Sequence, residues 1–292
     1  LKCAQLPTHG WLIQVMEAPT PVSALLHAGV VNLGGFVLIR LAPLLDAVPA
    51  AHALLVLVGT ATAVLAGLVM TTRISIKVML AWSTCAQMGF MLLECGLGAY
   101  PLALLHIVAH SCYKAHSFLA SGSVVERWRA ESLRPSNGGL SLVNWIGALA
   151  IGTIAVTAAG ALAGSSPSAE PALWALVSIV ALGLTPFVVT SFAAGWVRVV
   201  VMALTAFVIA GAYFLWHAVF GALLTPAAPA MRDLLITCAA FGLLFAVQAT
   251  LLTHPHGKLA HRLYPPLFAG LYLDELFTRF TFKVWPAKVV NQ

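Results

Sequence analysis

Apolar side chains dominate this chain of 292 residues: 61% are hydrophobic and only 8% carry a formal charge, and the mean hydropathy is +0.96. This composition excludes a water-soluble globular domain and predicts an all-α fold, a polytopic bundle of membrane-spanning helices. The net charge of +6 is spread too thinly for a nucleic-acid-binding surface. We interpret it as charge that sets the membrane topology.

The first predicted element is a break in a helix. Residues 1–5 end a helix that carries Lys2, and prolines follow at positions 7, 19 and 21. Proline inside a helix removes a backbone hydrogen bond and clashes with the preceding turn, so a regular helix cannot continue through this stretch. At membrane depth such a break is tolerated only where protein or water satisfies the backbone, and in transporters it often marks the ion path. Glu17 lies at this break and is an auxiliary candidate for that path.

The rest of the chain predicts about eight spanning helices, each apolar and long enough to cross a bilayer core of roughly 30 Å. They cover residues 21–41, 53–71, 78–96, 101–123, 139–164, 172–191, 198–221 and 231–253.

The loops between these helices predict an orientation. Basic residues occur in alternate loops, at 71–77, 124–138, 192–198 and 254–262. The opposite loops contain neither lysine nor arginine: 42–52, 97–100, 164–171 and 222–230. This positive-inside pattern places the first set in the cytoplasm. Arg40 departs from the pattern, and we expect it either to reach the membrane interface or to pair with Asp46.

The segment from Leu102 to Ser123 carries His106, His110 and Lys114 at four-residue spacing. On a helix these side chains share one face and rise roughly 6 Å per step. Ionisable groups inside hydrocarbon are costly unless they face protein or a wet cavity, and histidine titrates near neutrality. The pattern favours a proton path; a helix with packed, hydrogen-bonded histidines is the alternative.

Further ionisable residues lie on the neighbouring segments. His27 falls on an otherwise apolar helix face, where a packed core histidine is the alternative to a path residue. Lys77 begins the helix before the histidine-rich one. Glu94 lies near the far end of that helix, and we expect a solvated helix end rather than a partner for a neighbouring subunit's cation.

Two blocks of the sequence resemble the proton-conducting antiporter-type subunits. They read LKCAQLPTHGWLIQVMEAPTPVSALLHAGVVNLGGFVLIR and SIKVMLAWSTCAQMGFMLLECGLGAYPLALLHIVAHSCYKAHSFLASGSVVE, and together they cover residues 2–126. This superfamily includes subunit L of respiratory complex I, the large Mrp antiporter subunit and the DabB membrane subunits of inorganic carbon pumps. ECGLGAYPLALLHI, YKAHSFLASGS and LFAGLYLDELFTRFTFKVWP resemble the DabB group most. The chain opens within a family motif, so we expect it to be an N-terminally truncated product or a fragment.

The resemblance implies roles for several residues. Lys2 matches the membrane lysine that pairs with a glutamate in the preceding part of the family fold and gates proton movement. His27 would connect the half-channel to the lysine-bearing helix. Lys77 would extend the path toward the central axis, although a topology charge is an equal interpretation. We call His106, His110 and Lys114 the stripe. Together with these three, the predicted proton path comprises Lys2, His27 and Lys77.

The resemblance also divides the chain into three parts. Residues 1–126 form the proton-translocating core, and residues 263–292 form an amphipathic segment that either lies in the interface or docks on a partner. Residues 127–262 depart from the complex I pattern, because there is no lysine between Lys114 and Lys258. The stretch ALGLTPFVVTSFAAGW keeps a proline break at Pro186 without the lysine that serves the exit channel in those relatives.

The resemblance implies a transport and energy-coupling subunit, not an enzyme, in the inner (cytoplasmic) membrane of a bacterium. It would use the proton gradient to drive a soluble, carbonic-anhydrase-like DabA-type zinc protein on the cytoplasmic face. We expect no cofactor or metal in this chain: its cysteines form no CxxC pair, and His254, His256 and His261 fit no tetrahedral motif. The alternatives are a proton-translocating subunit of complex I or a hydrogenase, an Mrp-type cation/proton antiporter, and a non-conducting scaffold.

Overall fold

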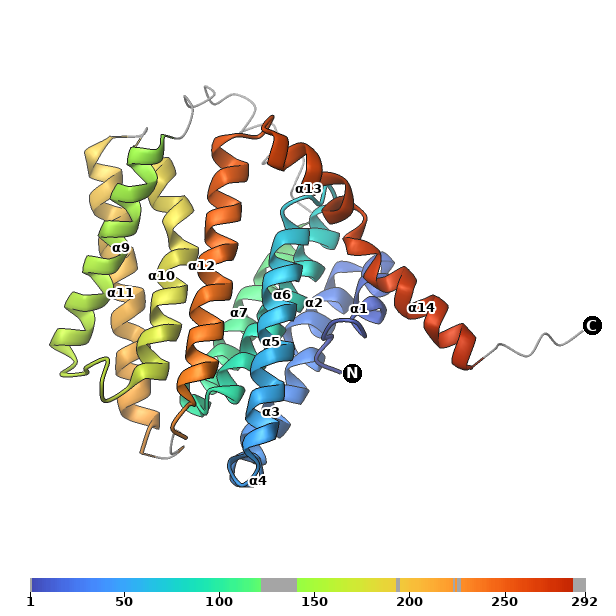
Figure 1. Ribbon diagram of the computed structural model, residues 1–292, viewed down its shortest axis with the longest axis horizontal. Coiled ribbons are helices and arrows are strands. Elements are labelled where there is room, and N and C mark those ends of the chain that lie inside the picture. Colours follow the sequence, from blue (N-terminus) through green and yellow to red (C-terminus); the bar gives the residue numbers. More distant parts are fainter. Residues whose placement is uncertain (1, 122–140, 193–194, 223, 225–226, 286–292) are drawn as a thin grey trace, which may run out of the picture.

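The computed structural model describes residues 2–121, 141–192, 195–222, 224 and 227–285. Over these residues the regular elements are helices, arranged as an upright bundle (Figure 1). This confirms the predicted all-α membrane fold. Within the described part of the chain, seven helical segments are long and apolar enough to span a membrane: α2 with α3 (Thr20–Arg40), α5 (Pro49–Met70), α6 (Ile76–Gly96), α9 (Leu142–Leu162), α10 (Pro171–Phe192), α11 (Trp196–Phe220) and α12 (Met231–Thr253).

The eighth predicted span is α7 (Tyr100–Ala120), which contains 21 residues. It is as long as its neighbours, but it is not among the seven apolar segments. Its histidines and Lys114 reduce the hydropathy of an otherwise apolar helix. A helix of this length with a polar face must bury that face against other helices, and α7 does so against α6 and α2.

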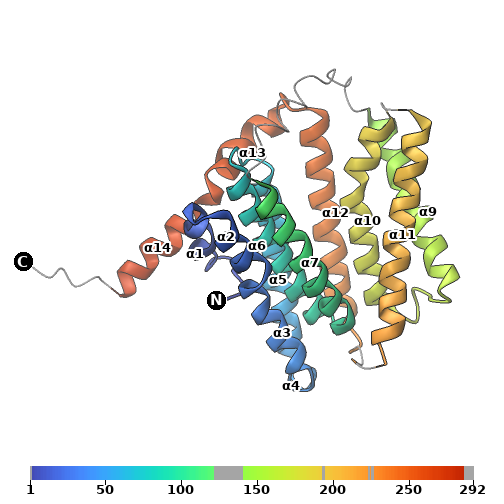
Figure 2. The same ribbon diagram turned by 180° about the vertical axis from the view of Figure 1, so that it is seen from behind.

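The helices form two groups (Figures 1 and 2). The first group runs from α1 (Gly10–Gln14) to α7, and the second contains α9, α10 and α11. The α12 helix lies between them and contacts both α5 and α10. The pair α5 and α6 forms the centre of the first group, so the residues on α6 are fixed in position by close packing.

The predicted N-terminal break is present, but the helix expected at residues 1–5 was wrong, since described residues 2–9 form turns and irregular backbone. Only α1 and the 3₁₀ turn η1 (Val15–Glu17) precede α2 (Thr20–Ala28), which begins after Pro19 and carries Pro21 in its first turn. A second interruption was not predicted: the 3₁₀ turn η2 (Val30–Asn32) separates α2 from α3 (Leu33–Arg40). The Asn32 Nδ2 atom donates to the Ala28 carbonyl at 2.8 Å and to Ser111 Oγ of α7 at 2.9 Å.

The predicted break at Pro186 was wrong. Pro186 lies inside α10, which continues as one helix to Phe192. Proline costs this helix a backbone hydrogen bond but need not end it when neighbouring helices hold both sides. The flanking residues Thr185 and Val188 are buried, so packing on both sides of the proline keeps the helix in line.

The helix ends alternate as the loop charges predict (Figure 1). The turn with Arg73, the start of α11 with Arg198 and the start of α13 (Lys258–Phe268) lie at one end of the bundle, while α4 (Ala42–Asp46) lies at the other. The basic residues Arg127, Arg129 and Arg134 of loop 124–138 lie outside the described residues.

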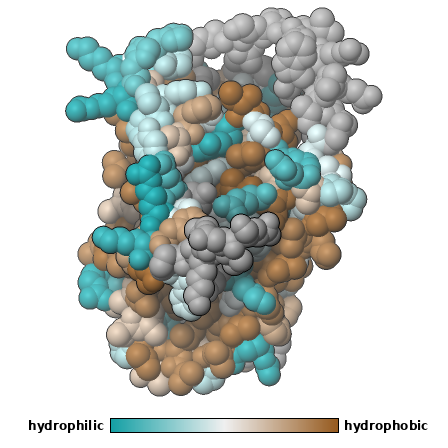
Figure 3. Space-filling view, turned by 90° about the vertical axis from the view of Figure 1, so that its right-hand side faces the viewer, coloured by the Kyte–Doolittle hydropathy of each residue, from teal (hydrophilic) through white to brown (hydrophobic). Residues whose placement is uncertain are grey.

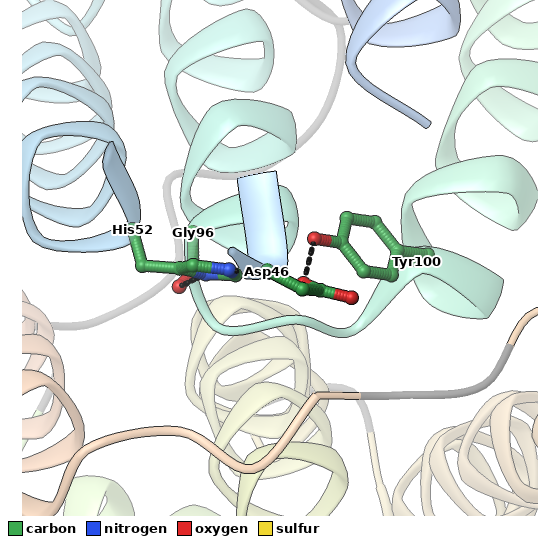
Figure 4. Close-up of polar contacts among 4 residues, drawn as sticks. All are labelled: Asp46, His52, Gly96 and Tyr100. Carbon is green, nitrogen blue, oxygen red and sulfur yellow. Dashed lines mark hydrogen bonds and ion pairs between the residues drawn. The ribbon is translucent and has the colours of Figure 1, made fainter. Parts of the chain in front are cut away.

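The alternative pairing of Arg40 with Asp46 was wrong. Arg40 is exposed, and the Asp46 carboxylate accepts a hydrogen bond from Tyr100 Oη at 2.6 Å and lies 3.0 Å from His52 Nε2. His52 Nδ1 lies 2.8 Å from the carbonyl oxygen of Gly96. Figure 4 shows this cluster, which ties α4, α5 and the end of α6 to the start of α7.

The C-terminal segment has two parts. Helix α13 docks on the α5–α6 turn, because Arg73 Nη2 donates to the Leu267 carbonyl at 3.0 Å and its guanidinium lies 5.3 Å from the Trp82 ring centroid. The turn η4 (Gly270–Tyr272) then leads to α14 (Leu273–Val284), which extends away from the bundle and leaves Phe280 exposed (Figure 1). Hydrophobic residues, interspersed with hydrophilic ones, cover much of the side of the molecule from which α14 projects (Figure 3).

Candidate functional site

The predicted stripe lies on α7, and Lys114 is its most buried member. Its side chain is fully inaccessible to solvent. The Lys114 Nζ atom donates to Ser83 Oγ of α6 and lies 3.5 Å from the Leu80 carbonyl oxygen. A buried ammonium is costly unless polar groups replace its water, and α6 supplies both of these oxygens.

One turn earlier on α7, His110 is 3% exposed. Neither of its ring nitrogens has a hydrogen-bond partner among the residues that the structure describes. Its ring centroid lies 5.8 Å from that of His106. At this distance, and with an interplanar angle of 53°, the two rings are in contact.

A cavity of about 270 Å³ adjoins both histidines. It lies between the first helix group and helices α10 and α11 of the second, and it is large enough for several water molecules. Its lining residues are Gln87, Phe90, His106, Ala109, His110, Tyr113, Val180 and Tyr213.

Glu94 is the site residue that the sequence analysis misjudged. The expected solvated helix end was wrong: Glu94 is fully buried, and its Oε2 atom lies 2.9 Å from His106 Nδ1. The turn after α6 is itself buried, because Leu97 and Ala99 pack into the core, and it shields the helix end from solvent. The available signal was an acidic residue within the apolar run LLECGL, since an ionisable residue at membrane depth is a functional candidate by default.

His27 is fully buried beside the stripe. Its ring stacks on Phe118 of α7 at a centroid distance of 4.3 Å, and it interacts electrostatically with both Lys114 and His110. The structure therefore brings His27 into the same interior as the three stripe residues. Its stacking also matches the alternative of a packed core histidine, so its part in a path stays a prediction.

Lys77 stabilises the helix break between α1 and α2. Its Nζ atom donates to the carbonyl oxygens of Ala18 at 2.7 Å and Met16 at 3.3 Å. These carbonyls belong to η1 and the residue that follows it, where the helix break leaves backbone groups without their usual partners. Glu17 lies on the same turn and is exposed. Stabilising the break is a role that the sequence analysis did not foresee for Lys77.

Lys2 is not part of this cluster. It is exposed, so the structure does not bring it to the α7 stripe. Over the described residues, no three histidine, cysteine, aspartate or glutamate side chains are grouped as they would be to hold a metal ion. That search includes His254, His256 and His261.

The site is thus a chain of ionisable groups inside the first helix group. Lys114 and His27 lie toward the end of the bundle with the basic loops, and Glu94 lies two residues before the opposite end of α6. From His106 to Lys114, α7 rises by about 12 Å, since each residue adds roughly 1.5 Å. A row of protonatable groups across that depth, next to a cavity that can hold water, is suited to passing protons.

The comparisons with known proteins agree with this arrangement. Residues 1–225 match the family model described as NADH:quinone oxidoreductase/Mrp antiporter, TM. The chain is 42% identical to the "Probable inorganic carbon transporter subunit DabB2" of Halothiobacillus neapolitanus, over 99% of this chain and 54% of that protein. It is 67% identical to the "Probable inorganic carbon transporter subunit DabB" of Hydrogenovibrio crunogenus, over 43% of this chain and 24% of that protein.

A respiratory subunit matches over a shorter region. The chain is 40% identical to the "NADH-quinone oxidoreductase subunit L" of Rhodobacter capsulatus, over 54% of this chain and 23% of that protein. The predicted resemblance to DabB subunits within the antiporter superfamily is therefore confirmed. The chain spans about half the length of the DabB2 relative. Because the family model covers most of its length, the chain belongs to the family of NADH:quinone oxidoreductase/Mrp antiporter membrane subunits.

Proposed function

We propose that this chain is the proton-conducting part of the membrane subunit of an inorganic carbon pump. The observation that carries the proposal is the row of His106, His110 and Lys114 on α7, of which the last two are buried. His106 contacts Glu94 of α6, and Lys114 donates to Ser83 of α6. Burying these groups is costly, and the cost is accounted for if protons pass along them. The relatives named as inorganic carbon transporter subunits support the transported class.

The pump would act through a partner protein. In this proposal, a proton that moves along the stripe changes the charge of the membrane subunit. This in turn changes the conformation or the charge of a soluble DabA-like partner on the cytoplasmic face. That partner, which is carbonic-anhydrase-like, holds the zinc and hydrates CO₂ to bicarbonate. This chain supplies the proton path and the membrane anchor, and the bacterial cytoplasmic membrane is the expected location.

The main alternative is a proton-translocating subunit of a complex I-type oxidoreductase. The 40% identity to subunit L over 54% of the chain supports it. The carbon pump is favoured because the DabB2 match covers 99% of the chain, against 54% for subunit L. The absence of any lysine between Lys114 and Lys258 also removes the usual exit-channel residue of the complex I relatives.

A pull-down from native bacterial membranes in mild detergent tests the proposal. The tagged chain should co-purify with one large soluble zinc protein and without NADH dehydrogenase or hydrogenase subunits. A set of redox subunits that carry iron–sulfur clusters would contradict the carbon-pump function and establish the alternative. A tagged membrane protein of another family from the same cells serves as the control for non-specific capture.

A further inference from the structure

Glu94 and His106 share a hydrogen bond at the end of the stripe that is remote from the basic loops. Glu94 is fully buried, and its Oε2 atom lies 2.9 Å from His106 Nδ1. Its second oxygen, Oε1, has no hydrogen-bond partner among the described residues. A buried carboxylate with one free oxygen is costly as a purely structural group, and it retains a place for a proton.

The neighbourhood of Glu94 supplies one direct proton donor. The titratable groups that interact with it are His106 of α7, Tyr213 of α11 and the adjacent thiol of Cys95. His106 is in turn one helical turn from His110, and both histidines and Tyr213 line the same cavity. The ionisable groups therefore follow one another from Lys114 through His110 and His106 to the α6 carboxylate, with a hydrogen bond at the last step, from His106 to Glu94.

Glu94 lies where a proton carrier is needed near the non-cytoplasmic side, and the second helix group has no lysine for that step. Described residues 141–192, 195–222 and 227–253 contain no lysine, so a relay across α9–α12 lacks its usual cation. Glu94 lies two residues before the end of α6, at the bundle end opposite the basic loops. An ionisable group is thus present near the non-cytoplasmic side within the first helix group itself.

We propose that Glu94 is the terminal proton carrier of this subunit and takes the place of the missing exit-channel lysine. When His106 is protonated and Glu94 is ionised, the Nδ1–H bond of His106 breaks and an O–H bond forms on Glu94 Oε2. The products are a neutral imidazole and a neutral carboxylic acid, so charge and atoms balance. The O–H bond of the carboxylic acid then breaks as a water molecule on the non-cytoplasmic side accepts the proton, which restores the carboxylate. This inference rests on the proposed proton-conducting function.

Glu94→Gln in the native complex, reconstituted into liposomes, tests the proposal. The amide has the same shape and accepts a hydrogen bond from His106, but it cannot carry the proton. We expect proton flux to fall at least about tenfold, because a positioned proton carrier is lost. Glu94→Asp keeps a carboxyl group and should restore part of the flux. Glu170→Gln is the matched control, since Glu170 also pairs with a histidine, His217, at 3.1 Å, but at a helix end with its side chain 36% exposed.

Infrared difference spectra across a pH step provide a readout that a merely structural role would not change. A carbonyl band of a protonated carboxyl should disappear in Glu94→Gln, shift in Glu94→Asp and remain in Glu170→Gln. Normal flux in Glu94→Gln, together with loss of flux in Lys114→Ala, would overturn the role of Glu94 and leave the proposed function intact. An unchanged carbonyl band in both Glu94 variants would overturn it as well. Normal flux in Lys114→Ala would instead contradict the proposed function itself.

Discussion

Ser83 and Lys114 show how a buried charge is held inside a membrane helix pair. Lys114 is fully buried, and its ammonium group donates to the Ser83 hydroxyl. The sequence spacing predicted that Lys114 shares a face with the two histidines, but it gave no sign that Ser83 would be its partner. That pairing depends on how α6 and α7 pack, which periodicity within one helix does not report.

Ser83→Ala should weaken this interaction. A hydrogen bond to a charged group contributes about 1.5–3 kcal/mol, so we expect a comparable loss of stability together with reduced proton flux. Thermal unfolding in detergent and flux in liposomes measure the two effects. Ser83→Thr keeps the hydroxyl and should retain most of both. The matched control is Thr205→Ala, which removes an exposed hydroxyl bonded to the Val201 carbonyl of its own helix at 2.8 Å. Equal behaviour of Ser83→Ala and Thr205→Ala would refute the role of Ser83.

At the scale of elements, the site depends on the close approach of α5 and α6. A Cβ atom at Gly89 would lie 2.5 Å from the backbone nitrogen of Ala63 and 2.8 Å from the Gly59 carbonyl oxygen. The two backbones are therefore in direct contact, as small residues permit in membrane helix pairs. Because α6 carries Ser83 and Glu94, this contact sets where the partners of the stripe lie.

Gly89→Leu should force α5 and α6 apart. We expect a lower thermal midpoint and loss of proton flux, because Ser83 and Glu94 move away from α7. Gly242→Leu on α12 is the control, since a Cβ atom added there meets nothing within 4 Å. A Gly89→Leu protein as stable and active as Gly242→Leu would show that the close packing does not position the site.

The elements also show what the sequence could and could not predict. Prolines predicted the N-terminal break, and apolar length predicted the spans, because both depend on the local chain. The interruption at η2, the continuity of α10 through Pro186 and the burial of Glu94 depend on contacts between helices. Lys77 was ambiguous for the same reason, since its acceptors, the Met16 and Ala18 carbonyls, are remote in sequence.

Across the whole molecule, the two helix groups contribute differently. The first group contains the stripe and its partners, while the second supplies Val180 and Tyr213 to the wall of the cavity beside the histidines. In our account the second group encloses the proton path instead of extending it. Helix α13 links the end of α12 back to the first group through Arg73, which ties the covering helices to the conducting ones.

The most direct test of this account is proton flux through the reconstituted native complex with Lys114→Ala. We predict flux at the background of empty liposomes, because the only lysine of the buried stripe is removed from α7. Lys258→Ala, which removes an exposed lysine at the start of α13, should conduct as the unmodified protein does. Flux through Lys114→Ala equal to that of Lys258→Ala, in an assembled complex, would contradict the claim that the α7 stripe carries protons.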